Sequence, residues 1–323
     1  MVSLYDHLCR YDTAAWQRAV DEVAAESHPI DRNATRIWFA FYPLDFFLTF
    51  QAAPDPASAV RVMGLMGRWL LADQVDTSHR FFYAHRYWPP IKAAVQRFST
   101  PPPDDLAALI GEVAEQASRT ARVDREGLIG LSAAALMTLR QAGVDAFAAP
   151  GQIHLSMRAR AMSPHQVMKK RAHDDWQGVF GFTRGLRKRW TITFDENEPD
   201  AHFELINGQE IATAAKSDPR EYRTTDPRCT VGEGPIPVEC RSASCGTCWV
   251  GVLGGAEKLS PVVDRDEGRR MKVFGYIDTD EPRPLIRLAC QTQAFGAVSI
   301  VIPPWNGIFA TWVQRHRAQQ APA

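Results

Sequence analysis

The chain is poor in cysteine, has no excess of charge of one sign and has no long apolar run. Only six of its 323 residues are cysteine, which excludes the dense disulfide framework of a small secreted protein. Lys/Arg and Asp/Glu are equally frequent, at 37 each, so no strong field attracts nucleic acid. The N-terminus lacks the basic and then apolar pattern of a signal peptide. We therefore expect a protein of a reducing compartment, the cytoplasm.

No apolar stretch reaches the length of about 18 residues that a transmembrane helix needs. The most apolar run, residues 37–50, is shorter than this and contains Pro43 and Asp45. We expect this aromatic run to pack in a core or at a subunit interface. A peripheral membrane contact is the less favoured alternative, and no transmembrane segment is predicted.

Two parts of different composition follow one another along the chain. Residues 1–180 have the apolar periodicity and the start and stop signals of helices, and predict a helical bundle of unidentified role. Residues 181–188 form a connector, residues 189–304 are rich in strand-forming alternation, and residues 305–323 form a tail. The predicted fold class is multidomain, with an α domain followed by an α+β domain.

Capping residues, prolines and glycines predict where the helices begin and end. Thr13 is the expected cap of the first helix, and Asp55 with Pro56 is expected to open the second. Pro89 and Pro90 should end or kink the third helix, and Gly143 should stop the fifth. The predicted helices are 14–27, 56–74, 76–87, 104–122, 124–141 and 163–172. In the second part, a turn at 207–208 and a helix at 209–216 are predicted among strands at 190–194, 202–206, 248–253 and 297–302.

Four of the six cysteines have a spacing that predicts a chemistry. Cys240, Cys245 and Cys248 are separated by four and then two residues, and Cys290 follows after a gap of 41 residues. The pattern C-x4-C-x2-C…C is the plant-type arrangement for a 2Fe-2S cluster, which transfers one electron at a time. Small loop residues allow the backbone to approach the sulfurs closely. The residues that we expect to surround the cluster and direct hydrogen bonds at its sulfurs are Arg241, Ser242, Ser244, Gly246 and Thr247.

Two alternatives to this ligand set stay open. Cys229 precedes Cys240 by eleven positions and is a competing ligand, although a buried free thiol is the simpler interpretation. Four cysteine sulfurs can also bind zinc tetrahedrally. Structural zinc sites usually have two closely spaced pairs, whereas Cys290 stands alone, so zinc is the less favoured metal.

The second part of the chain resembles the plant-type 2Fe-2S ferredoxin family over about residues 188–304. Beyond the cysteines, the resemblance includes a first hairpin at 190–194 and 202–205 and a later acidic helix at 263–271. It implies a β-grasp fold and one 2Fe-2S cluster with the four spaced cysteines as its metal ligands. Acidic residues outnumber basic ones in this part of the chain, whereas the first part is mildly basic.

The chain departs from this family at three places. Ala243 stands where the family commonly has glycine, three residues after the first cysteine, which bears on the backbone angle of the loop. An insertion at 218–237 precedes the cysteine loop and contains Cys229. A second insertion, at 276–284, lengthens the gap before Cys290.

The sequence has neither a G-x-G-x-x-G after a strand nor a G-x-x-x-x-G-K, so no flavin or nicotinamide site and no catalytic residue are predicted. His79 and His85 are six residues apart and make a poor helical metal pair, so no second metal is predicted. We predict a non-catalytic electron carrier, or an electron-transfer subunit of a larger redox assembly, whose partners are a reductase or an acceptor enzyme. The alternative hypothesis is a redox-sensing or structural 2Fe-2S protein whose helical domain is a regulated protein-binding module.

Overall fold

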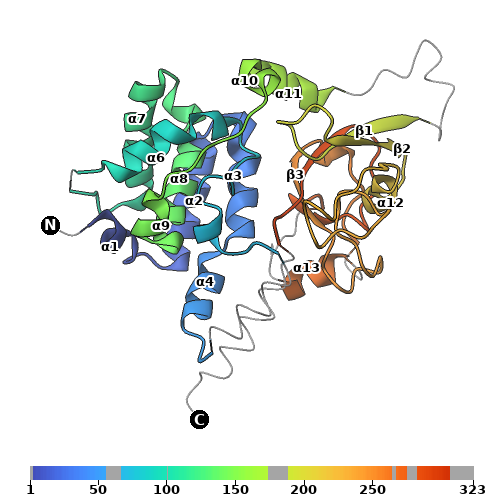
Figure 1. Ribbon diagram of the computed structural model, residues 1–323, viewed down its shortest axis with the longest axis horizontal. Coiled ribbons are helices and arrows are strands. Elements are labelled where there is room, and N and C mark those ends of the chain that lie inside the picture. The colour runs from blue at the N-terminus through green and yellow to red at the C-terminus, as the bar shows by residue number, and fades with distance from the viewer. Residues whose placement is uncertain are drawn as a thin grey trace. The chain divides into compact units, whose positions relative to one another are not determined.

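The computed structural model describes residues 3–55, 67–99, 101–173, 188–263, 267–274 and 282–305. The chain divides into two compact units. The helical unit comprises Met1–Phe47 and Leu70–Pro164, and the sheet unit comprises Leu48–Trp69 and His165–Ala323. Figure 1 shows the secondary structure of each unit. Of the described helices, none is long and apolar enough to cross a membrane. The predicted connector at 181–188 lies almost entirely outside the described residues.

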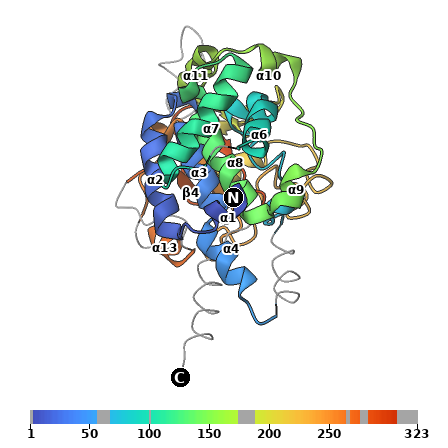
Figure 2. The same cartoon turned by 90° about the vertical axis from the view of Figure 1, so that its left-hand side faces the viewer.

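Four helices build the core of the helical unit and lie side by side in Figures 1 and 2. They are α2 (Thr13–Glu26), α3 (Pro29–Phe41), α7 (Leu106–Ala121) and α8 (Ile129–Ala142). Every residue of α8 from Ile129 to Arg140 is buried, as expected for a helix that is apolar on all sides. A Cβ at Gly130 would lie 2.1 Å from Oγ1 of Thr35, so glycine allows α3 to approach α8 closely.

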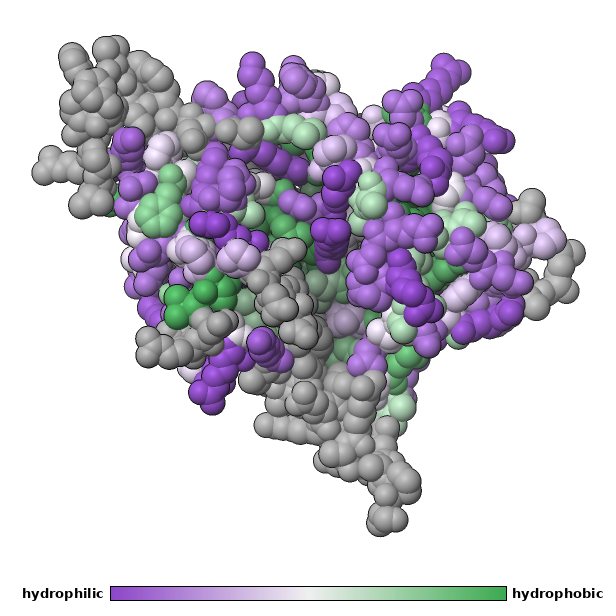
Figure 3. Space-filling model, turned by 180° about the vertical axis from the view of Figure 1, so that it is seen from behind, coloured by the Kyte–Doolittle hydropathy of each residue, from purple (hydrophilic) through white to green (hydrophobic). Residues whose placement is uncertain are grey.

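The other described helices before residue 173 are short. They are α1 (Leu4–Leu8), α4 (Leu44–Gln51), α6 (Trp88–Gln96), α9 (Val144–Ala148), α10 (Met157–Ala161) and α11 (Pro164–Ala172), with 3-10 turns η1 (Leu71–Asp73), η2 (Tyr83–Tyr87) and η3 (Arg125–Gly127). In the aromatic run 37–50, Ile37, Trp38 and Phe41 are fully buried, which confirms the prediction that this run packs in a core. Hydrophilic residues cover most of the face shown in Figure 3.

Some of the predicted helix boundaries hold, and others do not. Gly143, with a φ of 82°, ends α8 as predicted, and α11 begins at the predicted Pro164. The cap of α2 is Asp12 rather than Thr13, because the Asp12 carboxylate accepts a hydrogen bond from the backbone N–H of Ala15 at 2.7 Å. An aspartate before the first turn also complements the positive end of the helix dipole.

The two prolines at positions 89 and 90 begin a helix instead of ending one. Residues 76–82 form turns, η2 follows, and α6 starts at Trp88 with proline in its first turn. Proline fits there because the first N–H groups of a helix have no partner inside the helix. The prediction of a helix over 76–87 ended by Pro89 was therefore wrong.

The predicted helix at 56–74 is also wrong where it can be compared. Residues 56–66 lie outside the described residues, and residues 67–70 are not helical. Gly67, with a φ of 112°, instead forms an antiparallel bridge with Trp305, and a Cβ at this glycine would lie 2.3 Å from the carbonyl oxygen of Pro304. The tertiary contact overrides the local helical pattern.

A five-stranded mixed sheet forms the centre of the sheet unit. Its strands are β1 (Arg189–Thr193), β2 (His202–Ile206), β3 (Trp249–Gly254), β4 (Ile286–Leu288) and β5 (Val298–Val301), in the order β2-β1-β5-β3-β4. β1 and β5 run parallel, and the other neighbours are antiparallel. The predicted turn at Gly208 has a φ of 78° and leads to α12 (Ile211–Ala215). β2 alternates buried and exposed residues, whereas β5 is buried throughout, as its central place requires.

A segment from early in the chain completes the sheet unit. The N–H of Arg68 donates to the carbonyl of Pro304 at 2.9 Å, next to the bridge between Gly67 and Trp305. The ring of Trp69 lies edge-on to that of Phe50, with centroids 4.3 Å apart. The later helix α13 (Arg269–Phe274) begins well after the start of the predicted range 263–271, part of which lies outside the described residues.

Candidate metal centre

The fold brings the fourth cysteine to the loop that holds the other three. Cys248 directly precedes β3, and Cys290 follows the end of β4 by two residues. β3 and β4 pair with Trp249 opposite Leu288, and the N–H of Ala289 donates to the carbonyl of Cys248 at 2.9 Å. The pairing of two strands that are distant in sequence therefore places Cys248 and Cys290 together.

The loop 240–248 wraps its backbone around the first sulfur. The N–H groups of Ser242, Ser244 and Cys245 point at Sγ of Cys240 over 3.4, 3.3 and 3.3 Å. The hydroxyl of Thr247 lies 3.2 Å from Sγ of Cys245. Successive backbone N–H groups that converge in this way form a site for an anion, which suits an anionic iron–sulfur cluster.

Left-handed residues give the loop this curvature. Arg241, Ala243 and Gly246 have φ values of 54°, 58° and 71°. The departure from the family glycine at Ala243 therefore leaves the backbone in a conformation that glycine adopts easily and alanine does not. The penalty for a side chain there is on the order of 1 kcal/mol. Because Ala243 is also buried, its methyl group is part of the packing behind the loop.

The four cysteines differ in exposure, and their thiols influence one another's pKa values as two pairs. Cys248 and Cys290 are only 2% and 1% exposed, whereas Cys240 and Cys245 are half-buried. Cys240 interacts with Cys245, and Cys248 with Cys290. A 2Fe-2S cluster takes four thiolates, two on each iron, so two pairs fit it. Among the described residues, no group of three or more His, Cys, Asp or Glu side chains is gathered for a single metal ion.

The pairing also sets the proton affinities of the thiols. Burial acts to raise the pKa of Cys240, but hydrogen bonds from the Ser244 side chain and the Ser242 N–H outweigh it and lower the pKa to about 6. A hydrogen bond to Cys290, together with burial, raises the pKa of Cys248 well above its ordinary value, and the same bond lowers the pKa of Cys290 to about 7. Since thiolates bind metal, loading the site releases the remaining protons.

Two predicted residues have roles other than those expected. The Arg241 guanidinium forms an ion pair with Glu233 and lies 3.4 Å from the hydroxyl of Thr213, rather than turning to a sulfur. Glu233 also pairs with Lys216 at 2.7 Å. The insertion 218–237 therefore supports the cysteine loop through Glu233. Gly246 contributes its left-handed backbone.

The sequence-based prediction missed Gln291. Its side-chain amide lies 3.5 Å from Sγ of Cys290 and donates to the carbonyl of Arg241 at 3.2 Å, which ties the last cysteine to the loop. In the sequence, only its position directly after Cys290 could have indicated that Gln291 belongs to the site.

Cys229 lies apart from this constellation. It is buried, and its thiol donates to the carbonyl of Pro235 at 3.4 Å. Burial raises the pKa of Cys229 to about 12. A thiol that stays protonated is a poor metal ligand, so these contacts favour its interpretation as a structural residue.

The histidines of the helical unit form a buried pair. Nδ1 of His85 lies 2.9 Å from Nδ1 of His79, and Nε2 of His79 lies 3.2 Å from the carbonyl of Val75. With its proton on Nε2, His79 donates to Val75 and accepts from His85. Burial lowers the pKa of His85 to about 4 and that of His79 well below its ordinary value. Both rings are therefore neutral near pH 7.

Comparison with known proteins agrees with this geometry. Residues 229–294 match the family model described as a 2Fe-2S iron-sulfur cluster binding domain. Neither the curated proteins nor the solved structures gave a match. The matched segment contains all four spaced cysteines, and its similarity to this family indicates a domain that binds a 2Fe-2S cluster. This confirms the resemblance for that segment.

Proposed function

We propose that the chain is a one-electron carrier, or the electron-transfer subunit of a larger redox assembly. One 2Fe-2S cluster is held by Cys240, Cys245, Cys248 and Cys290. The observation that carries the proposal is the strand pairing that brings Cys290 next to Cys248, with three backbone N–H groups of the loop directed at Sγ of Cys240. When bound, the cluster accepts and releases a single electron.

The proposed site has an inner half, formed by the two buried cysteines, and an outer half, formed by the two half-buried ones. Cys248 and Cys290 are buried, so water is excluded around the inner pair. Cys240 and Cys245 are half-buried and face the exposed residues Ser242 and Ser244. An electron enters and leaves through this outer half, where a redox protein approaches most closely. The partners are a reductase and an acceptor enzyme.

The arrangement of the sheet supports a β-grasp fold for residues 189–304. The antiparallel strands β2 and β3 flank a central parallel pair of β1 and β5, and α12 follows the hairpin of β1 and β2. In this proposal the region 1–180 is a helical domain that docks a partner or joins the chain to an assembly.

Chemical analysis of the purified protein tests the cluster. We expect two irons and two acid-labile sulfides for each chain, with visible absorption that bleaches on reduction. An anaerobic mixture of the reduced protein with a one-electron acceptor should then show rapid reoxidation. Zinc without labile sulfide would overturn the cluster assignment. A cluster that is reduced but passes no electron to any acceptor would overturn the carrier role.

A further inference from the structure

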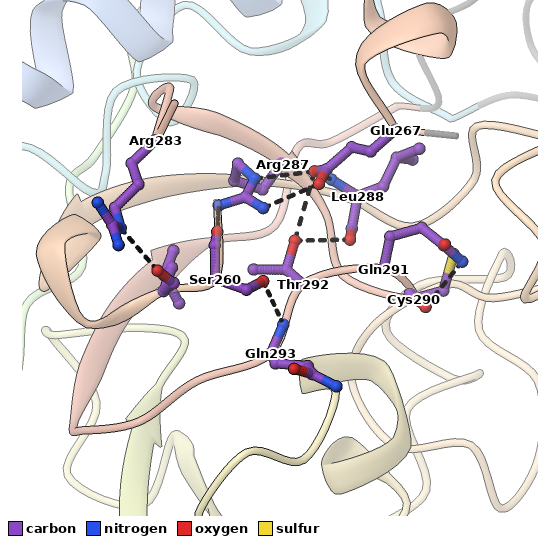
Figure 4. A network of polar contacts seen from close by, with 10 residues as sticks. Ser260, Glu267, Arg283, Arg287, Leu288, Cys290, Gln291, Thr292 and Gln293 are labelled. Atoms are coloured by element: carbon purple, nitrogen blue, oxygen red, sulfur yellow. Dashed lines mark hydrogen bonds and ion pairs between the residues drawn. The ribbon is translucent and has the colours of Figure 1, made fainter. Parts of the chain in front are cut away.

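A buried carboxylate lies beside the strand that carries the fourth cysteine. Glu267 is 1% exposed, and its two oxygens accept from Nε and Nη2 of Arg287 at 2.9 and 2.8 Å. Arg287 is itself fully buried and lies three residues before Cys290. Figure 4 shows the carboxylate and the guanidinium facing each other in parallel, which is the strongest geometry for such a pair.

Glu267 also takes the place of a neighbouring strand. β4 is only three residues long and lies at an edge of the sheet, where none of the described strands pairs with its outer side. The N–H of Leu288 donates to Oε1 of Glu267 at 2.7 Å. A carboxylate thus satisfies a buried backbone donor two residues before Cys290, which would otherwise be costly to bury.

The same network reaches the chain on the other side of the cysteine. The hydroxyl of Thr292 lies 2.8 Å from the carbonyl of Leu288 and 3.3 Å from Glu267 (Figure 4). Nη1 of Arg287 donates to the carbonyl of Ser260 at 2.9 Å, and the hydroxyl of Ser260 accepts from the N–H of Gln293 at 3.1 Å. The backbone is therefore fixed both before and after Cys290.

We propose that Glu267 and Arg287 are positioning residues for the cluster site, and that as a pair they keep the buried charge beside Cys290 at zero. The proposal rests on the proposed cluster function. Each member alone would leave a full charge in a dry interior, where charges act strongly on their surroundings. A cation there stabilises the reduced, more negative cluster, and an anion destabilises it. The pair acts on the cluster only through geometry and field.

Opposite single substitutions separate this role from a general loss of stability. In Glu267→Gln the Arg287 cation is unbalanced, and in Arg287→Met the Glu267 anion is unbalanced. The double variant E267Q/R287M is neutral again, and Arg287→Lys keeps the charge but loses the forked geometry. The matched control is Glu196→Gln, because Glu196 also accepts a two-pronged ion pair, from Arg171 at 2.7 and 2.8 Å, within the same unit.

The measurements are iron and sulfide content, the EPR spectrum of the reduced protein, and the midpoint potential by redox titration. We expect a more positive potential in E267Q, a more negative one in R287M and a return towards the wild-type value in the double variant. R287K should keep the potential near wild type with an altered EPR line shape. E196Q should lower the thermal midpoint while its potential and EPR spectrum stay unchanged.

Loss of the cluster from E267Q and R287M, with retention in E196Q, also supports a positioning role. The proposal is overturned if both single variants shift the potential in the same direction, or if E196Q changes the cluster as much as E267Q does. A wild-type protein that holds no cluster would instead defeat the proposed function.

Discussion

The sheet unit and the helical unit are stabilised by different kinds of buried contact. In the sheet unit, ion pairs such as Arg287–Glu267 and Arg171–Glu196 lie in or near the core. In the helical unit, α8 is surrounded by apolar side chains, and the buried histidines are neutral. The helical unit also has a largely buried pair, Lys92–Asp76, and a buried carboxylate, Asp31, that accepts from the backbone N–H groups of Tyr83 and Ala84 at the start of η2.

The difference follows from where each unit satisfies its backbone. Helices bond their own N–H and C=O groups, so their interiors can be apolar. The strands around the cysteines are short, and their edges leave donors such as the Leu288 N–H that charged side chains must satisfy. A site that holds four cysteines in fixed places thus depends on directional contacts, whereas a helical core depends on shape and volume.

The largest effect should come from the cysteines themselves. Cys290→Ser removes the inner thiolate, so we expect loss of most of the cluster, measured by iron content and visible absorption. Cys229→Ser is the matched control, because Cys229 is equally buried but donates to the carbonyl of Pro235. We expect it to retain the cluster. A Cys229→Ser protein without cluster would reopen the question of the ligand set.

A cavity in the helical core should affect only stability. Leu136 is fully buried in α8. Leu136→Ala should lower the free energy of unfolding by about 3 kcal/mol, because it removes apolar contacts and leaves a cavity. Urea unfolding followed by circular dichroism measures this, and the control Val144→Ala at an exposed site should change little. If Leu136→Ala also shifted the midpoint potential of the cluster, the expectation that a cavity in the helical unit affects only stability would be wrong.

Acid should destabilise the helical unit through its histidine pair. The pKa of His85 is lowered to about 4 in the folded protein, so the unfolded state binds more protons between about pH 6.5 and 4. Stability from this group is present above pH 6.5 and is lost as the pH falls. At pH 5 the loss should be on the order of 2 kcal/mol.

A pH series of thermal midpoints checks this effect. His85→Gln should flatten the dependence, whereas His154→Gln, at an exposed site of the same unit, should leave it unchanged. An equally steep fall in stability for His85→Gln would show that the acid sensitivity has another origin.

The smallest effect should be at Ala243. Ala243→Gly relieves the left-handed conformation of the cysteine loop and should stabilise the sheet unit by up to about 1 kcal/mol. The same change at Ala214, which is buried in α12, should be destabilising by a similar amount. Thermal midpoints of the cluster-loaded proteins show whether each substitution stabilises or destabilises the sheet unit. Destabilisation at both sites would mean that the methyl group of Ala243 packs too well to be lost.

The sequence predicted the first two strands of the sheet better than it predicted several of the helices. Ligand chemistry restricts the spacing of Cys240, Cys245 and Cys248, and strand alternation located β1 and β2 closely. In contrast, the apolar periodicity at 56–74 predicts a helix, although Gly67 forms a β-bridge with Trp305. Local periodicity carries no information about such a distant partner.

The residues that brace Cys290 were not predicted for the same reason. Glu267 and Arg287 are twenty positions apart, and in the sequence each is an ordinary charged residue. Only the folded chain shows that both are buried and paired. Gln291 is similar, because its contact with the carbonyl of Arg241 spans fifty positions.

The bridge between Gly67 and Trp305 has a consequence for the synthesis of the protein. Residues 48–69 leave the ribosome first, and their partners at 304–305 follow only after some 235 further residues. At about 5–20 residues per second, this delay is on the order of ten to fifty seconds. Throughout that time the segment with Phe50 and Trp69 is without the strand region it joins. The fold around the candidate iron site therefore closes only after residue 305 has been synthesised, and cluster insertion into that closed fold follows this step.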